Sequence, residues 1–242
     1  MYAVFKRELF SLLNSLMAYI TIGVFLLVSG LLLWFFPDTS MLDYGYAEMN
    51  GFFSLAPFLF MFLIPAITMR SFAEERREGT YILLASRPLT DWQIILAKYF
   101  ACFVLVLFSL IPTLLYYYSI VELGLPKGNI DGGAVAGSYI GLLLLGSAFV
   151  AIGIFSSSVT KNQVIAFAVA VFISFIVYSG FDALSKIFSL NILESVFIWL
   201  SVNQHFQSMS RGVIDTRDLV YFITFVFVFL GLTKLVLGGR KW

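Results

Sequence analysis

The densest group of charged side chains in this sequence lies in residues 70–98, which read RSFAEERREGTYILLASRPLTDWQIILAK. Five consecutive charged residues, Glu74 to Glu78, mix both signs. A mixed-sign surface suits docking to a protein better than binding to lipid headgroups, which favour cations alone. The alternative is a solvated helix whose charges pair along its own surface, as Glu74 and Arg77 can. Charge alone leaves both interpretations open.

Motifs for catalysis or nucleotide binding are absent from the sequence. It contains no G-x-x-x-x-G-K-[ST], no H-E-x-x-H and no G-x-S-x-G. The one histidine, His205, is expected to be a solvated side chain, and the one cysteine, Cys102, cannot form an intramolecular disulfide. We therefore predict no catalytic residue, no metal site and no cofactor in this chain.

The composition places most of the chain in lipid. Of its 242 residues 60% are apolar and 12% are charged, with a mean hydropathy of +0.95. Soluble domains are roughly 45–50% apolar and about 25% charged. The net charge of +1 argues against nucleic acid as a partner.

Six apolar runs are long enough to cross a bilayer, which needs about 20 residues of helix. The chain is therefore predicted to be an all-α integral membrane protein, with residues 1–242 forming one domain. The predicted spans lie near 16–36, 52–69, 99–121, 134–158, 163–181 and 219–237.

Two further helical segments are expected at the membrane surface. Apolar residues recur at helical spacing from Val4 to Leu16, which predicts an N-terminal amphipathic helix. In the loop 182–218, the segment Ile187–Val202 has about the length of a re-entrant or interfacial segment and contains the polar residues Asn191 and Glu194. It is interpreted as a re-entrant or interfacial helix before the last span.

Lysine and arginine set the expected orientation. With six spans, eleven of the fifteen fall on the side of both termini and of the loop 70–98, and four fall on the other side. The positive-inside rule then places both termini in the cytoplasm.

The elements around the charged group predict a stiff connection to the membrane. Helix-forming residues run from Phe72 to Glu78, and Gly79 follows where a left-handed residue closes a helix. An apolar patch at Tyr81–Leu84 comes next. Thr90 and Gln93 then form a capping box, which predicts a helix that begins at Asp91 and continues into the third span.

The stretch EERREGTYILLASRPL at 74–89 resembles the cytoplasmic loop of type-2 ABC transporter permeases, where the pattern is E-R-x-x-G-T-x-E-x-L-L-x-x-P. Leu84 and Pro88 fit the end of that pattern, whereas Ile82 stands where many relatives carry Glu. The resemblance implies a coupling helix held by the ATP-binding subunit. The residues it assigns to ATPase coupling are Glu74, Glu75, Arg76, Arg77, Glu78, Gly79 and Thr80.

Two other segments are similar to the same family. SSSVTKNQ at 156–163 resembles the short inner turn between the fourth and fifth spans. Residues 203–222 are similar to the stretch before the last helix in the subgroup of gliding-motility and nitrous-oxide-reductase maturation permeases. The resemblance implies an exporter subunit of the cytoplasmic (inner) membrane with gliding motility as the first choice of system. It also implies two copies of a separate ATP-binding subunit and a second permease copy or a related permease.

The remaining features leave alternatives open. Gly137 and Gly141 form a G-x-x-x-G pair in the fourth span, which favours close helix packing, either within the chain or at a dimer face. The interiors of the six runs hold no Asp, Glu, Lys, Arg or His, so any energy for transport is expected from another subunit. A non-transporting membrane scaffold is the alternative function.

Overall fold

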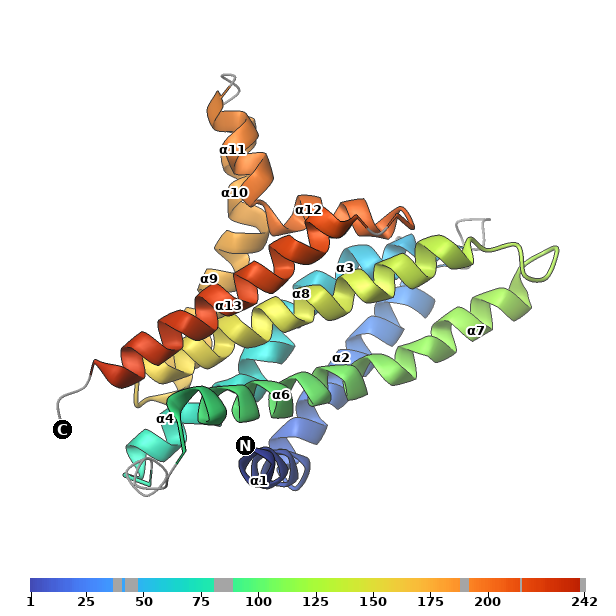
Figure 1. The fold of residues 1–242 in the computed structure, drawn as a ribbon. Helices are drawn as coiled ribbons and strands as arrows, with labels where there is room; N and C mark the ends of the chain where they lie inside the picture. The colour runs from blue at the N-terminus through green and yellow to red at the C-terminus, as the bar shows by residue number, and fades with distance from the viewer. Residues whose placement is uncertain (37–40, 42–47, 81–88, 188–191, 214, 240–242) are drawn as a thin grey trace.

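The computed structural model describes residues 1–36, 41, 48–80, 89–187, 192–213 and 215–239, and the regular elements within these ranges are all helical (Figure 1). The apolar patch at Tyr81–Leu84, which includes Ile82, and Pro88 lie outside the described residues. The helices are α1 (Tyr2–Leu13), α2 (Leu16–Trp34), α3 (Asn50–Thr68), α4 (Arg70–Arg77), α6 (Asp91–Leu110), η1 (Ile111–Thr113), α7 (Leu114–Leu123), α8 (Gly132–Val159), α9 (Gln163–Phe175), η2 (Ile176–Gly180), α10 (Phe181–Ile187), α11 (Ile192–Leu200), α12 (Val202–Ser210) and α13 (Thr216–Gly238).

Six helical segments are long and apolar enough to cross a membrane, which confirms the predicted all-α fold with six spans. Three of the six are single helices: α2, α8 and α13. The other three are continuous runs of helix: α3 continued by α4, then α6 continued by η1 and α7, and finally α9 continued by η2 and by α10 as far as Ser185. Pro112 lies in the 3-10 turn η1, where its missing N–H interrupts the α-helical hydrogen bonding between α6 and α7. The chain is a multi-pass membrane protein.

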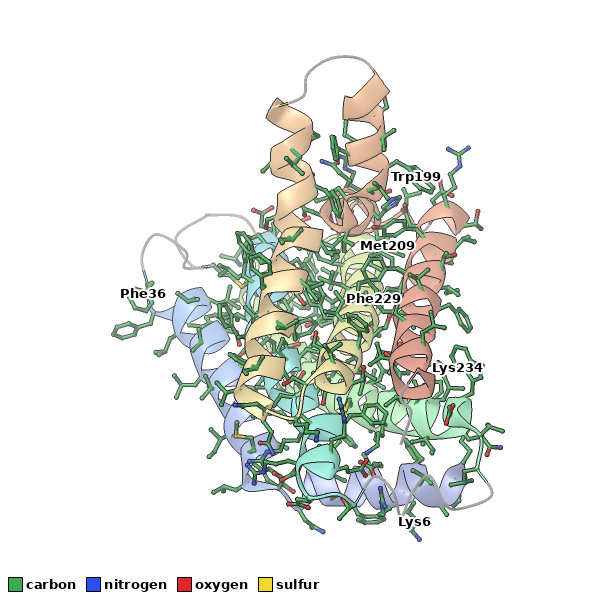
Figure 2. The ribbon with its side chains drawn as sticks, turned by 90° about the vertical axis from the view of Figure 1, so that its left-hand side faces the viewer. Lys6, Phe36, Trp199, Met209, Phe229 and Lys234 are labelled. Atoms are coloured by element: carbon green, nitrogen blue, oxygen red, sulfur yellow. The ribbon has the colours of Figure 1, made fainter. Side chains whose placement is uncertain are left out.

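The predicted amphipathic helix is α1, and it is separate from the first span. Ser15 is extended, with φ −83° and ψ 123°, so the chain turns between α1 and α2. Figure 2 shows α1 lying across one end of the bundle, with Lys6 at the foot of the view. We call this end, which also carries α4, the α4 end, and the opposite end the α12 end (Figure 1).

Helix α8 is the centre of the bundle because its small residues let three neighbours approach closely. Of its most apolar window 78% is buried, against 17% for α13 and 22% for α2. A Cβ on Gly153 would lie 2.0 Å from Thr68 Oγ1 of α3, and one on Gly146 would lie 3.0 Å from Val106 Cγ1 of α6. The backbone of α8 is therefore in direct contact with both helices.

The G-x-x-x-G pair of α8 faces α12. A Cβ on Gly137 would lie 2.5 Å from the carbonyl oxygen of Met209, and one on Gly141 would lie 3.1 Å from the Phe206 ring. Gly212, at φ +82°, continues this contact beside Ala134. The small residues at this position thus seat α12 of the same chain across the α12 end of α8 (Figure 1).

Helices α10 and α11 form a hairpin at the α12 end. The π-helical turn η2 joins α9 to α10, and α11 returns antiparallel to α10, with Phe181 and Phe197 stacked at a ring distance of 6.4 Å. The predicted helix at Ile187–Val202 thus corresponds to α11, and residues 188–191 lie outside the described ranges. This hairpin projects beyond the neighbouring helices (Figure 2).

The expectation that His205 is solvated was wrong. Its side chain is 14% exposed, and its Nδ1 lies 2.7 Å from Asp218 Oδ1 on α13. Its Nε2 lies 3.0 Å from the carbonyl oxygen of Trp199, and its ring stacks on Tyr221 at 3.9 Å between centroids. Because α12 folds back onto the first turns of α13, a residue that reads as a loop histidine is held between α11 and α13.

The contact between α8 and α3 yields a stability prediction. Gly153→Ala forces a methyl group into Thr68, so we expect it to lower the free energy of unfolding by about 1–3 kcal/mol. Gly231→Ala is the matched control, because a Cβ there meets nothing within 4 Å. Equal unfolding free energies for the two variants, measured by denaturant titration in mixed micelles, would contradict close packing at Gly153.

Candidate coupling site

Helix α4 starts immediately after α3, and a side chain of α8 caps its first turn. The first N–H groups of a helix have no partner within it. Ser157 Oγ accepts hydrogen bonds from the N–H of Phe72 at 2.9 Å and of Ala73 at 3.0 Å, and donates to the carbonyl oxygen of Met69 at 3.0 Å. One serine of α8 therefore fixes the junction between α3 and α4.

The inner face of α4 packs against the same end of α8. Ser71, Phe72 and Ala73 are buried, and the Arg76 guanidinium donates a hydrogen bond to the carbonyl oxygen of Ser158. The last carbonyl groups of a helix also lack partners within it, so Arg76 supplies a cation where the α8 dipole is negative. Arg76 thus joins α4 to α8 rather than extending into solvent.

Four charged side chains from three helices meet behind α4. Lys98 of α6 is 1% exposed, and its Nζ lies 3.1 Å from Glu8 Oε2 of α1 and 3.0 Å from Glu75 Oε1 of α4. Arg7 Nη2 lies 2.9 Å from the same Glu75 oxygen and also pairs with Glu8. Two cations and two carboxylates therefore balance one another, which a buried ammonium requires. We call Arg7, Glu8, Glu75 and Lys98 the charge cluster.

The charge cluster also has an apolar wall. Lys98 Nζ lies 5.1 Å from the centre of the Phe72 ring, and Phe72 is itself fully buried. An ammonium group over an aromatic face is attracted to the ring, more strongly where water is excluded. Phe72 and Glu75 are three residues apart on α4, so one face of that helix holds Lys98.

The charges of the cluster shift the pKa values of two of its members, Glu8 and Arg7. Burial alone would raise the pKa of the Glu8 carboxyl, but Lys98 and Arg7 outweigh burial and hold this pKa below its ordinary value. Burial opposes the charged form of Arg7, yet its pairing with Glu8 and Glu75 raises its pKa. Glu8 is therefore ionised over the physiological range, and α1 remains tied to α6.

The free surface of α4 is its tip. Arg77, Glu78, Gly79 and Thr80 are exposed, whereas Glu74 is half-buried. Gly79 has φ +74°, as predicted for a left-handed residue that closes the helix, and Thr80 Oγ1 donates to the carbonyl oxygen of Glu75 at 3.4 Å. The seven residues that the sequence grouped together thus separate: Glu75 and Arg76 point into the protein, and Arg77 to Thr80 are accessible. We call Arg77–Thr80 the α4 tip.

The predicted start of α6 is confirmed. Thr90 Oγ1 accepts from the N–H of Gln93, Gln93 Oε1 accepts from the N–H of Thr90, and the helix begins at Asp91. At the same end, Lys234 Nζ of α13 lies 5.4 Å from the Trp92 ring centre. The first turns of α6 are thus fixed from both sides, close to Lys98.

Sequence reasoning missed Arg7, Glu8, Lys98 and Ser157 as parts of this site. Lys98 carried a signal, because it is the charge nearest the start of an apolar span. The serine triplet at 156–158 carried another, because hydroxyl groups at the end of an apolar helix commonly bond to backbone groups. Neither signal named a partner, since the partners come from distant parts of the chain.

The family model described as ABC-2 family transporter protein matches residues 39–239. The chain belongs to the ABC-2 transporter family. Members of this family are membrane subunits of ABC transporters, which function with an ATP-binding partner, and are not themselves catalytic. No curated protein matches the sequence. Arg7 and Glu8 precede the matched residues, so part of the charge cluster lies outside the matched region.

The charge cluster of this ABC-2 subunit yields a second prediction. Lys98→Met leaves Glu8 and Glu75 without their shared ammonium partner, so we expect the free energy of unfolding to fall by about 3–5 kcal/mol. Lys127→Met is the control, since its pair with Glu122 is exposed and contributes less than about 1 kcal/mol. Denaturant titration in mixed micelles measures both, and a loss no larger at Lys98 than at Lys127 would refute the buried cluster.

A pH dependence follows from the lowered pKa of Glu8. A carboxyl whose pKa is lower in the folded chain stabilises the fold above its ordinary value of 4.5, and this contribution is lost as the pH falls through the lowered pKa. We therefore expect the melting temperature of the native chain to exceed that of Glu8→Gln at neutral pH. The difference should shrink progressively as the pH falls below 4.5. A constant difference across this range would show that Glu8 is not ionically paired.

Proposed function

We propose that this ABC-2 chain is the permease subunit of an ATP-driven exporter in the cytoplasmic (inner) membrane, and that a separate ATP-binding subunit docks on the α4 tip. The observation that carries this proposal is the way α4 is held. Its tip is accessible and mixed in charge, while its inner face is bonded to α8 through Ser157 and to α1 and α6 through Glu75. A subunit that moves the tip moves the centre of the bundle.

The mechanical connection has three branches. Helix α3 continues into α4 across Met69 alone. Ser157 and the Ser158 carbonyl transmit displacement of α4 to α8, the most buried helix. Lys98 transmits it to α6 and, through Glu8, to α1. Because these contacts are short and desolvated, they resist stretching better than exposed ion pairs do.

The charge distribution supports the orientation. Lys6, Arg7, Lys98 and Lys234 belong to elements that reach the α4 end, together with the three arginines of α4. Positively charged residues favour the cytoplasmic side. The α4 tip then faces an ATPase in the cytoplasm, and both termini are cytoplasmic.

Two permease subunits and two ATP-binding subunits complete the proposed transporter. The second permease is an identical copy or a related chain, and the poorly buried helices α2, α9 and α13 leave apolar faces for it or for lipid. Gliding motility is the system proposed first, on the similarity of residues 203–222 to that subgroup. In that role the bundle transmits force to partner proteins or exports a lipid-like or bulky amphiphilic cargo.

Docking is tested by exchanging charges at the α4 tip. We expect Arg77→Glu with Glu78→Arg to weaken retention of the co-expressed ATP-binding subunit by about tenfold or more, because mispaired charges at an interface cost several kcal/mol. The unfolding free energy should stay unchanged, since both residues are exposed. Lys127→Glu with Glu122→Lys exchanges an exposed pair elsewhere and is the matched control. Full retention in the α4-tip variant would refute docking at this site.

Reconstituted vesicles separate transport from a scaffold role. If the chain is a permease, ATP hydrolysis by the bound subunit should drive cargo movement or a change in accessibility at the α12 end. Hydrolysis without either change would replace the permease proposal with the scaffold alternative. The α4-tip exchange should abolish the accessibility change along with binding.

A further inference from the structure

A cavity of about 610 Å³ opens at the α12 end between α3, the η2–α10 segment and α12. Its volume is within the range of small-molecule sites, roughly 300–1,000 Å³. The π-helical turn η2 forms one wall, and such turns are frequent at functional sites. The lining residues that bear on its chemistry are Asn50, Ser54, Phe58, Tyr178, Asp182 and Arg211.

This cavity is lined by one carboxylate and one guanidinium among its described residues, and they differ in how they are held. Of the described residues that line it, Asp182 and Arg211 are charged. The Asp182 carboxylate already accepts hydrogen bonds from Ser201 at 2.9 Å, Asn203 at 2.7 Å and Gln204 at 3.1 Å, which tie α10 to α12. Arg211 is exposed and forms no ion pair within the described part of the chain. Its planar guanidinium is suited to bind an acidic oxygen group in two-point fashion.

The α3 wall changes from polar to aromatic along one stripe. Asn50, Ser54, Phe58 and Phe62 are spaced by four residues and therefore share a face of α3. All four are exposed, with Phe58 at 46% and Phe62 at 59%. The Phe58 ring also contacts Tyr178, at 5.6 Å between centroids. The polar cavity is thus continuous with an exposed aromatic surface further along α3, towards the α4 end.

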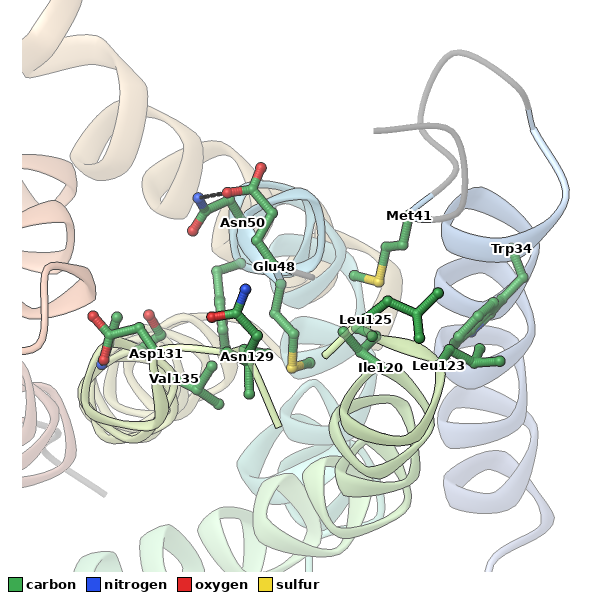
Figure 3. Close-up of a pocket in the computed structure, with 16 residues that line it drawn as sticks. Trp34, Met41, Glu48, Asn50, Ile120, Leu123, Leu125, Asn129, Asp131 and Val135 are labelled. Atoms are coloured by element: carbon green, nitrogen blue, oxygen red, sulfur yellow. Dashed lines mark hydrogen bonds between the residues drawn. The ribbon is translucent and has the colours of Figure 1, made fainter. Parts of the chain in front are cut away.

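A second cavity at this end has a negative net charge among its described lining residues, whereas Asp182 and Arg211 balance in the first. It measures about 790 Å³, and Glu48 and Asp131 line it without any lysine or arginine among its described lining residues (Figure 3). Glu48 accepts a hydrogen bond from Asn50, and Asp131 caps the first turn of α8. An acidic ligand is therefore repelled from this cavity and favoured at Arg211.

We propose that the cavity beside Arg211 binds an anionic amphiphile, with its acidic headgroup on the Arg211 guanidinium and its alkyl chain along Phe58 and Phe62. The headgroup carries a phosphate, sulfate or carboxylate oxygen, and the chain is a saturated alkyl or acyl chain. The two halves of the ligand match the two halves of the site, which are the Arg211 guanidinium at one end and the exposed aromatic stripe at the other. This binding needs no ATP-binding subunit, so it can be tested independently of the docking proposal.

The probe for this site is dodecyl phosphate, added to the purified full-length chain in a neutral maltoside detergent and counted by native mass spectrometry. We expect saturable binding of one molecule per chain. Arg211→Gln should weaken dodecyl phosphate binding by about tenfold, because the loss of a hydrogen bond to a charged group lowers affinity by about that factor. Ser54→Trp should weaken it similarly by filling the polar half of the stripe. A melting curve for each variant verifies that the fold is kept.

Two controls define the site. Arg217→Gln removes another exposed arginine, and Leu123→Trp fills the acidic cavity, so neither should change binding. Inorganic phosphate should compete at least about tenfold more weakly than dodecyl phosphate, since it gains nothing from the aromatic stripe. Non-saturable binding, equal affinity in Arg211→Gln, or equal competition by inorganic phosphate would each overturn the proposal.

Discussion

Lys98 carries its ammonium group into a position from which water is almost excluded, and this requirement organises the α4 end of the protein. An unpaired charge there would cost several kcal/mol, so carboxylates must come to it. Glu8 comes from α1 and Glu75 from α4, and Arg7 balances their second charge. Helix α1, helix α4 and the start of α6 consequently form one unit.

The same requirement explains how α4 could be held inside the protein and still offer a free tip to the proposed ATP-binding subunit. One face of this short helix bonds to Lys98, to Ser157 and to the end of α8. At its tip, the one side-chain hydrogen bond seen within the described part of the chain joins Thr80 to the Glu75 carbonyl group. A helix without the inner contacts would bend when pulled, and one without the free tip would offer an ATPase nothing to hold. Mixed charge on an eight-residue helix supplies both properties.

Beyond this end, close backbone packing replaces charge as the organising interaction. In lipid, apolar side chains gain little by meeting one another, so helices associate through shape and small residues. The glycines of α8 at 137, 141, 146 and 153 allow α12, α6 and α3 to reach its backbone. A rigid central helix bonded to α4 at one end and covered by α12 at the other can carry a displacement along the whole bundle.

Local patterns made much of the fold predictable. Six long apolar runs give six helices because an unpaired backbone is intolerable in lipid. The capping box at Thr90 and the left-handed Gly79 also followed from local chemistry, and both are present. The sequence could not show which of the five charged side chains at 74–78 face the protein and which face solvent, because that depends on where the surrounding helices lie.

The sequence by itself determined that this chain is an all-α membrane protein with six spans, an amphipathic first helix and a charged segment between the second and third spans. These properties depend on hydrophobic period and composition, which act over a few residues at a time. Tertiary structure alone decided that Glu75 and Arg76 face inward and that Ser157 caps α4. It also decided that His205 meets Asp218 and that Arg211 borders a cavity. Each of these contacts joins helices that are far apart in the chain. Residue spacing predicts the faces of a single helix, but it does not show which other helix packs against each face.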